Sequence, residues 1–348
     1  MEQEVYNEFD INQIPEPESI SDVIYNLMVN PNLSPINYFN DFSEALPDPK
    51  GDKDNSGIEP GIIELDNGTK LVSLSTHALH HHLEQDPKIA AEILVARAVR
   101  KMICLGAEPI ALSAMLYHIN YSDPNGNYIA SGAKAGLDEA AAAYGIKIAD
   151  RKIRFDNFEE HDSQSPTLIV SLMGIVPVDK KGNTKIMNAN FKNKGNNIFM
   201  IGKTTDDIAT SDYLEYFHGI SHSPLPEFDL KFEVKLVKTL KGLIAENLIM
   251  SASPVGKGGL FFSLLRAGWV NELGFDITTA AENRIDSFLF GEAMGRIIVG
   301  VDPDVEDEFV DFVYESKIPF FTLGHVTKGE IRIDDESFGY IDKMSTNL

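Results

Sequence analysis

The stretch 253–259 (SPVGKGG) carries residues that could bind an anion. It precedes an apolar helical pattern, so its backbone N–H groups and the side chain of Lys257 could face a phosphate. Its spacing is not that of a Walker loop, and a tight turn that needs positive φ is the alternative interpretation. Lys257 and Gly258 are therefore candidate cofactor-binding residues.

Glu292 and Arg296 stand four residues apart in the segment FGEAMGR, just before an apolar run. On a helix, this spacing would let the two side chains form an ion pair, which is the structural interpretation. The functional interpretation is that both charged groups face a substrate. Glu292 and Arg296 are the candidate substrate-binding residues of this segment.

Arg151, Lys152 and Arg154 form a local cationic group in a strongly acidic chain. They follow the apolar segment 146–149, so the pattern places them in a loop after a strand. A loop of this kind suits a phosphate, and a solvated run of charges is the alternative. Arg151 and Lys152 are further candidate cofactor-binding residues.

Four histidines, His77, His80, His81 and His82, are the obvious metal candidate. On one helix, His77 and His81 would share a face and could bind the same ion. No second ligand pair at a fixed spacing accompanies them, so the pattern favours a solvated turn or a helix start.

The single cysteine, Cys104, lies on an apolar helical pattern, which favours a core position over a nucleophile. No spacing indicates a Ser-His-Asp or Cys-His arrangement, and the catalytic residues stay unknown.

The composition is that of a soluble globular protein long enough for two domains. The chain has 348 residues, of which 43% are hydrophobic and 24% charged, and its formal net charge is −23. This charge argues against a nucleic-acid partner but permits a small phosphorylated substrate held by a few cations. No apolar run reaches the ~20 residues of a membrane helix, and the acidic N-terminus does not resemble a secretory signal. We therefore expect a cytoplasmic protein with no membrane partner.

The first half is organised around a helix predicted over residues 86–104. Apolar residues recur there at helical spacing, and Gly106 and Pro109 predict a helix end followed by a turn. The order of elements is β-β-α-β-α-β-β, which indicates an α+β (α/β layered) domain. The other predicted elements are a hairpin over 62–65 and 71–74, strands over 110–116, 146–149 and 165–178, a polar loop over 121–128, and a helix over 131–144.

The second half also mixes strands with amphipathic helices. We predict an N-terminal extension with a flexible loop over residues 1–57, one domain over 58–180 and another over 181–340. The extension contains one short predicted helix near 21–29. In the second half the patterns predict strands over 198–201, 297–301, 320–326 and 330–333, and helices over 232–248, 260–266 and 305–315.

Six short segments, in chain order, carry a resemblance to a known family. They are residues 30–33, Asp86 with the helix after it, 104–109 (CLGAEP), 166–170 with Gly174, 251–252 with 258–260, and 289–296 (LFGEAMGR). Together they resemble the synthetase subunit of phosphoribosylformylglycinamidine synthase, of the aminoimidazole ribonucleotide (AIR) synthetase-like superfamily. The resemblance spans roughly residues 20–335 and is greatest to the C-terminal half of that subunit.

The resemblance implies a two-domain fold, with an N-terminal mixed sheet that pairs in a dimer or fused pseudodimer and a C-terminal α/β sandwich. It implies a purine-biosynthesis ligase that uses ATP and Mg²⁺ to form an iminophosphate, which ammonia displaces. The implied partner is a second copy or a paired synthetase-type chain. By the same resemblance, Arg100, Arg151 and Lys152 would contact phosphates, Glu292 would contact substrate, and Asp86 would bind the metal.

The sequence departs from the family pattern where the family has carboxylates. Ala114 replaces an aspartate in the strand after GAEP, and Pro254 and Lys257 replace two more. These changes remove oxygen ligands of the kind that Mg²⁺ prefers. The open interpretations are a ligase component whose site another chain completes, a non-catalytic structural homologue that keeps the fold and dimer surface, and ligase chemistry on another substrate.

Overall fold

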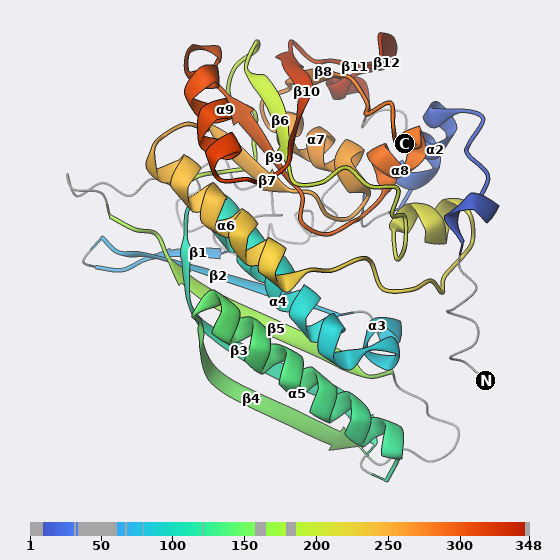
Figure 1. The fold of residues 1–348 in the computed structure, drawn as a ribbon, viewed down its shortest axis with the longest axis vertical. Helices are drawn as coiled ribbons and strands as arrows, with labels where there is room; N and C mark the ends of the chain where they lie inside the picture. Colours follow the sequence, from blue (N-terminus) through green and yellow to red (C-terminus); the bar gives the residue numbers. More distant parts are fainter. Residues whose placement is uncertain are drawn as a thin grey trace, which may run out of the picture. The chain divides into compact units, whose positions relative to one another are not determined.

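The chain folds into two compact units, each built on its own β-sheet (Figure 1). The computed structural model describes residues 10–30, 33, 61–66, 68–78, 80–120, 122–156, 165–178 and 186–344. The α+β class and the two-sheet organisation expected from the sequence are confirmed. The flexible loop predicted in the N-terminal extension, at residues 48–57, lies outside the described residues. None of the described helices combines the length and the apolar content that a membrane span requires.

The first unit is a five-stranded sheet in the order β1-β2-β5-β3-β4, with helices on one face (Figure 1). All neighbouring strands are antiparallel except β3 and β4, which are parallel. The strands are β1 (Gly61–Glu64), β2 (Lys70–His77), β3 (Glu108–Asn120), β4 (Lys147–Asp156) and β5 (Thr167–Ile175), and the helices are α3 (His80–Gln85), α4 (Pro87–Cys104) and α5 (Pro124–Tyr144).

Alternation along the strands separates a buried face from an open one. Leu112 and Leu116 on β3, and Leu168 and Leu172 on β5, are buried beneath the helices. The intervening residues form the opposite face, which the described helices leave open. We call it the open face, and its central residues are Ser73, Ser75, Ser113, Met115, Ile169, Ser171 and Met173.

Helix α4 confirms the helix predicted over residues 86–104. Asp86 is its N-cap: a carboxylate oxygen accepts a hydrogen bond from the Ile89 N–H at 2.9 Å. Gly136 of α5 lies so close to α4 that a Cβ there would meet the Lys88 carbonyl oxygen at 2.1 Å. Cys104 is buried, and burial raises its pKa to about 12, so its predicted core position is confirmed.

Two predicted boundaries in the first unit were wrong. Helix α5 begins at Pro124, inside the stretch predicted as a polar loop, because Asp123 caps it and proline suits the first helical position. Strand β4 continues to Asp156, so Arg151, Lys152 and Arg154 lie on a strand rather than in a loop. Because β4 is an edge strand, charged side chains are tolerated there and help to block further pairing.

The histidine-rich stretch is divided between two elements. His77 is the last residue of β2, and His80 begins α3, as the helix-start interpretation expects. His77 and His81 therefore do not share one helix. His82 is buried rather than solvated. Within the described part of the chain, no group of three or more His, Cys, Asp or Glu residues could hold a metal ion.

A segment distant in sequence completes the first unit. Residues Glu227–Lys241, which include most of α6 (Leu230–Ala245), belong to it although the sequence assigned 181–340 to one domain. Arg100 of α4 donates to a carboxylate oxygen of Glu233 at 2.6 Å, and both side chains are almost fully buried. The hydroxyl of Tyr144 is buried near this pair, and burial, with Glu233 as the second cause, raises its pKa.

The second unit is a seven-stranded mixed sheet in the order β12-β11-β8-β10-β6-β9-β7 (Figure 1). Neighbours are antiparallel except β8 and β11. Phe261 packs edge-to-face against Phe275 and at a tilt against Phe290 within its core. Its strands are β6 (Asn197–Ile201), β7 (Ser251–Pro254), β8 (Gly274–Ile277), β9 (Ile297–Val301), β10 (Phe320–Thr327), β11 (Glu330–Ile333) and β12 (Glu336–Tyr340), and its helices are α2 (Ile20–Met28), α7 (Gly259–Trp269), α8 (Ile285–Phe290) and α9 (Glu306–Glu315).

Short elements of the second unit escaped the sequence patterns. β8, β12 and α8 were not predicted, and β7 was assigned to a glycine-rich turn. These elements have four to six residues, too few for a clear period. The short helix predicted near 21–29 is α2, capped by Ser19, and its apolar residues Val23 and Leu27 join the core of this unit.

We expect the Arg100–Glu233 pair to be essential for the stability of the first unit. Arg100→Met leaves the Glu233 carboxylate buried without its cation, which should lower the free energy of unfolding by ~3–5 kcal/mol. Urea unfolding followed by far-ultraviolet circular dichroism measures this loss. The double variant Arg100→Met/Glu233→Leu should recover most of it, because neither charge then remains.

The matched control is Lys241→Met on α6, the helix that carries Glu233. It removes an exposed pair with Glu108 at 3.7 Å, which should cost less than ~0.5 kcal/mol. Equal losses for Lys241→Met and Arg100→Met would contradict the importance of the buried pair.

Candidate functional site

The carboxylate of Glu292 lies at the centre of a buried polar cluster in the second unit. One of its oxygens accepts hydrogen bonds from the backbone N–H groups of Asp212 and Gly258, each at 2.9 Å. Glu292 follows α8, whereas Gly258 precedes α7 and Asp212 precedes a π-helical turn at Tyr213–Phe217. Three segments distant in sequence therefore meet at one carboxylate.

Lys257 supplies the cation of this cluster. Its ammonium group lies 2.9 Å from one carboxylate oxygen of Asp212, whose side chain is only 4% exposed. The other Asp212 oxygen is buried and has no hydrogen-bond partner among the described residues. Half of the Lys257 side chain is exposed, so the pair connects a buried carboxylate with the surface.

Burial and the neighbouring charges shift the ionisation of this cluster. Burial, reinforced by the Asp212 charge, raises the pKa of Glu292 to about 7, against the opposing effects of Lys257 and the two N–H donors. Burial acts to lower the pKa of Lys257, but Glu292 and Asp212 outweigh it and the pKa is raised. Lys257 is therefore firmly protonated, and Glu292 is poised to titrate near neutral pH.

Backbone geometry makes glycine necessary in the turn before α7. Gly258 and Gly259 both have positive φ, 76° and 73°. A Cβ on Gly259 would lie 2.6 Å from the Leu289 carbonyl oxygen, which is backbone and cannot move aside easily. Arg266 of α7 donates to the Lys257 carbonyl at 2.8 Å, and Ser263 donates to the Gly259 carbonyl at 2.7 Å. The tight turn expected as the alternative is therefore present, and α7 fixes it.

Arg296 has a different role from Glu292. It is 1% exposed and donates to the carbonyl oxygens of Gly291 and Ala293, at 2.5 and 3.4 Å. Residues 291–296 are not helical, so the i, i+4 geometry of the ion-pair interpretation does not arise. Arg296 closes the loop that carries Glu292.

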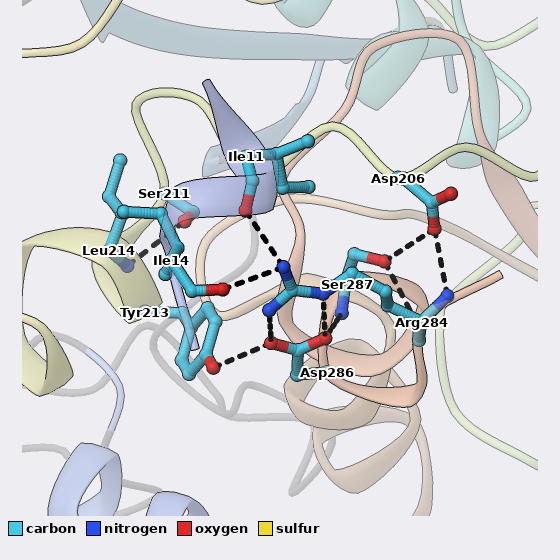
Figure 2. Close-up of polar contacts among 9 residues, drawn as sticks. All are labelled: Ile11, Ile14, Asp206, Ser211, Tyr213, Leu214, Arg284, Asp286 and Ser287. Carbon is cyan, nitrogen blue, oxygen red and sulfur yellow. Dashed lines mark hydrogen bonds and ion pairs between the residues drawn. The ribbon is translucent and has the colours of Figure 1, made fainter. Parts of the chain in front are cut away.

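A second buried cluster surrounds Asp286 at the start of α8 (Figure 2). Arg284 binds both carboxylate oxygens of Asp286, at 2.6 and 3.1 Å, and Tyr213 donates to one of them at 2.8 Å. Arg284 also donates to the carbonyl oxygens of Ile11 and Ile14, at 2.9 and 2.8 Å. The cluster therefore attaches the N-terminal segment to the second unit.

The predicted site residues divide between the two units. Lys257, Gly258 and Glu292 meet in the second unit, with Arg296 supporting their loop. Asp212, which completes this cluster, was not predicted, since the sequence around it contains no motif. The other candidates, Asp86, Arg100, Arg151 and Lys152, belong to the first unit.

Within the first unit these four candidates do not form one site. Asp86 caps α4, and Arg100 is buried against Glu233. Arg151 is opposite Ala114 in the register, on the helix-covered face, and pairs with Asp138 of α5. Lys152 is opposite Met115 on the open face and pairs with Asp150 at 3.3 Å. Consecutive strand residues point to opposite faces, so Arg151 and Lys152 cannot bind one phosphate together.

The cluster around Glu292 does not fit a magnesium ion. Two N–H groups bind one oxygen of Glu292 and the Lys257 ammonium binds one oxygen of Asp212, so the protein's own groups already occupy one oxygen of each carboxylate. A divalent ion beside Lys257 would meet an adjacent positive charge. The turn that could have held a phosphate instead holds the carboxylate of Glu292.

Comparison with known proteins places most of the chain in one family. Residues 57–176 match "AIR synthase related protein, N-terminal domain", and residues 193–335 match the C-terminal domain of the same family. A phosphoribosylformylglycinamidine synthase subunit PurL from Alkaliphilus metalliredigens is 26% identical over 96% of this chain and 46% of its own length. The PurL of Moorella thermoacetica is 26% identical over 90% and 42%. The chain thus spans about half the length of these curated relatives.

Solved structures share the fold. T. maritima PurL complexed with FGAR has a TM-score of 0.67 at 15% identity, over 82% of this chain and 48% of that chain. The ATP complex of T. maritima PurL gives 0.65 at 14% identity, over 82% and 46%. A chain of the HypE-HypF complex gives 0.63 at 14% identity and is matched over 96% of its length, against 86% of this chain.

The raised pKa of Glu292 predicts a pH dependence of stability. Between the usual glutamate pKa and about 7, the folded protein retains a proton that the unfolded chain releases, so the stabilising effect of this proton is lost as pH rises. The free energy of unfolding of the wild type, minus that of Glu292→Gln, should therefore fall between about pH 5 and pH 7 and level off above. Urea unfolding of both proteins across this range tests it, and a difference independent of pH would contradict the buried, proton-binding carboxylate.

Proposed function

The chain belongs to the AIR synthase related protein family, and on this premise we propose that it is a phosphoribosylformylglycinamidine synthase-like component of purine nucleotide biosynthesis. The reaction class would be ATP-dependent C–N bond formation. The observation that carries the proposal is the similarity to PurL subunits over nearly the whole of this chain. The six short segments that resemble this family, in the same order along the chain, support the same assignment.

We propose that a second synthetase-type chain completes the active site, since a second copy of this chain would lack the same carboxylates. The chain spans about half of its curated relatives, which leaves one half of their length without a counterpart here. The carboxylates that the family uses are replaced at Ala114, Pro254 and Lys257. A Mg²⁺ ion bound at the Glu292 cluster would lie beside the positive charge of Lys257. Metal ligands would therefore come from the partner.

The open face of the first sheet is the proposed pairing surface. Ser75 on β2 and Ser171 on β5 form a hydrogen bond with each other at 2.7 Å, and Ser113 on β3 is opposite Ser171. Small hydroxyl side chains at its centre would let another sheet approach closely. Met173, which is 44% exposed, adds an apolar contact. Of the predicted phosphate ligands, Lys152 shares this face, so it is the one we propose to reach a ligand bound there.

The second candidate is a non-catalytic structural homologue. The charge pairing around Glu292 favours it, because groups expected to bind ligands instead bind one another. Arg100 is likewise committed to Glu233. Such a protein would keep the fold and the pairing surface without performing the reaction.

Nucleotide binding distinguishes these candidates. Calorimetric titration of the purified chain with Mg-ATP should give no binding, because no described cluster supplies metal ligands. Mixing with a synthetase-type chain that carries the missing carboxylates should produce ADP that depends on formylglycinamide ribonucleotide and ammonia. Binding by the chain alone would contradict the incomplete site, and the absence of ADP from the mixture would favour the structural homologue.

A charged substitution tests the pairing surface. Ser75→Glu places a carboxylate at the centre of the open face, and burying it against a second sheet would be costly. By analytical ultracentrifugation we expect the wild type to be a dimer and Ser75→Glu to be a monomer. Ser131→Glu, an exposed serine on α5, is the matched control and should remain a dimer. A monomeric wild type would contradict self-pairing.

A further inference from the structure

A pocket of about 170 Å³ lies between α5 and the sheet of the first unit. We call it the α5 pocket. It is on the helix-covered face of the sheet, because Leu116 and Leu168, which line it, are buried there. The lining residues are Ala114, Leu116, Ala130, Ala133, Lys134, Leu137, Arg151, Lys152, Ile153 and Leu168.

The interior of the α5 pocket is apolar because alanine, leucine and isoleucine side chains make up most of its lining. Ala130 and Ala133 on α5 are across from Ala114 on β3, and these three methyl groups leave the space. Leu137 and Leu168 close the sides, at 4% and 1% exposure. An apolar cavity of about 150 Å³ in another protein binds benzene, so this volume suits a group the size of one ring.

The mouth of the α5 pocket is cationic. Lys134 of α5 and Arg151 of β4 both pair with the single carboxylate of Asp138, Lys134 at 2.9 Å. The hydrogen bond from Lys134, together with the Arg151 charge, outweighs the opposing effect of burial and lowers the pKa of Asp138. Two cations thus share one anion, which leaves one positive charge in excess. The third cation of the lining, Lys152, belongs by its register to the open face.

We propose that the α5 pocket binds a small carboxylate whose apolar body is about the size of a benzene ring. The ring fills the space between Ala114, Ala133 and Leu137. The carboxylate lies at the mouth, where Arg151 can donate two parallel hydrogen bonds. In a chain with a net charge of −23, a local excess of positive charge next to an apolar cavity is a selective feature for such a ligand.

This binding site shares Ala114 and Lys152 with the proposed ligase role, but it is tested separately. It lies on the opposite side of the sheet from the open face, and none of its lining residues belongs to the Glu292 cluster. A failure to bind a carboxylate would leave the assignment to purine biosynthesis untouched, and a failure of ATP turnover would leave this proposal untouched.

Benzoate is the probe, and methyl NMR of the full chain is the measurement. Benzoate should cause saturable shifts of the methyl signals of Ala133 and Leu137. Arg151→Gln should weaken binding about tenfold, which is the size expected for one charge-assisted contact. Lys147→Gln, on the same strand but outside the lining, should bind as the wild type does. Benzamide, the neutral isostere, should bind the wild type more weakly than benzoate does. To Arg151→Gln, benzamide and benzoate should bind with equal affinity.

Ala133→Leu fills the α5 pocket and should abolish binding. Because this buried position tolerates added volume poorly, Ala130→Leu at the partly exposed rim is a second variant, and the NMR spectrum without ligand shows whether each protein is folded. Absence of saturable shifts in the wild type would overturn the proposal. Unchanged benzoate binding in either folded leucine variant would overturn it equally, as would equal effects of Arg151→Gln and Lys147→Gln.

Discussion

The buried ion pair between Arg100 and Glu233 is the constraint on which the first unit depends. It joins α4 to α6. Arg100 and Glu233 are 133 positions apart, and part of the second unit lies between them in the sequence. Removing two charges from water is costly, and their attraction offsets that cost only when the geometry is good. The pair is joined by one hydrogen bond at 2.6 Å, and the second oxygen of Glu233 is buried with no hydrogen-bond partner among the described residues. Because an unpaired Arg100 would be strongly unfavourable in the core, the pair also specifies which helix occupies this place.

The same principle governs the second unit, where the protein's own charges fill positions that could have held ligands. Glu292 accepts the two N–H groups at the turn before α7, and Lys257 pairs with Asp212. Arg284 and Asp286 form a bidentate pair that also holds the backbone at Ile11 and Ile14. Charges satisfied internally stabilise loops and fix their positions, but they are less available to a metal or a phosphate.

The local part of this structure could be predicted from the sequence, and the long-range part could not. The period of residues 86–104 and the helix-stop glycine after them defined α4, and the hairpin predicted over 62–65 and 71–74 corresponds to β1 and β2. The Asp123–Pro124 pair was a helix start that the polar composition of its surroundings concealed. The partners of Arg100 and Glu292 are 133 and 80 positions away, and no local pattern encodes such distances. Lys257, Gly258 and Glu292 were identified individually as candidates, but their common cluster with Asp212 arises only from folding.

Lys257 determines what a partner must contribute if the proposed ligase role holds. Its ammonium group, held by Asp212 and near Glu292, adds positive charge where the related enzymes are expected to have an aspartate. A magnesium ion could not bind to these two carboxylates without displacing that ammonium group, since like charges in a low-dielectric site repel strongly. A partner would therefore have to supply the acidic metal ligands, while this chain supplies cations such as Lys152 on the open face. Because the acidic ligands and the cations would come from different chains, each chain would be inactive alone, and catalysis would require their assembly.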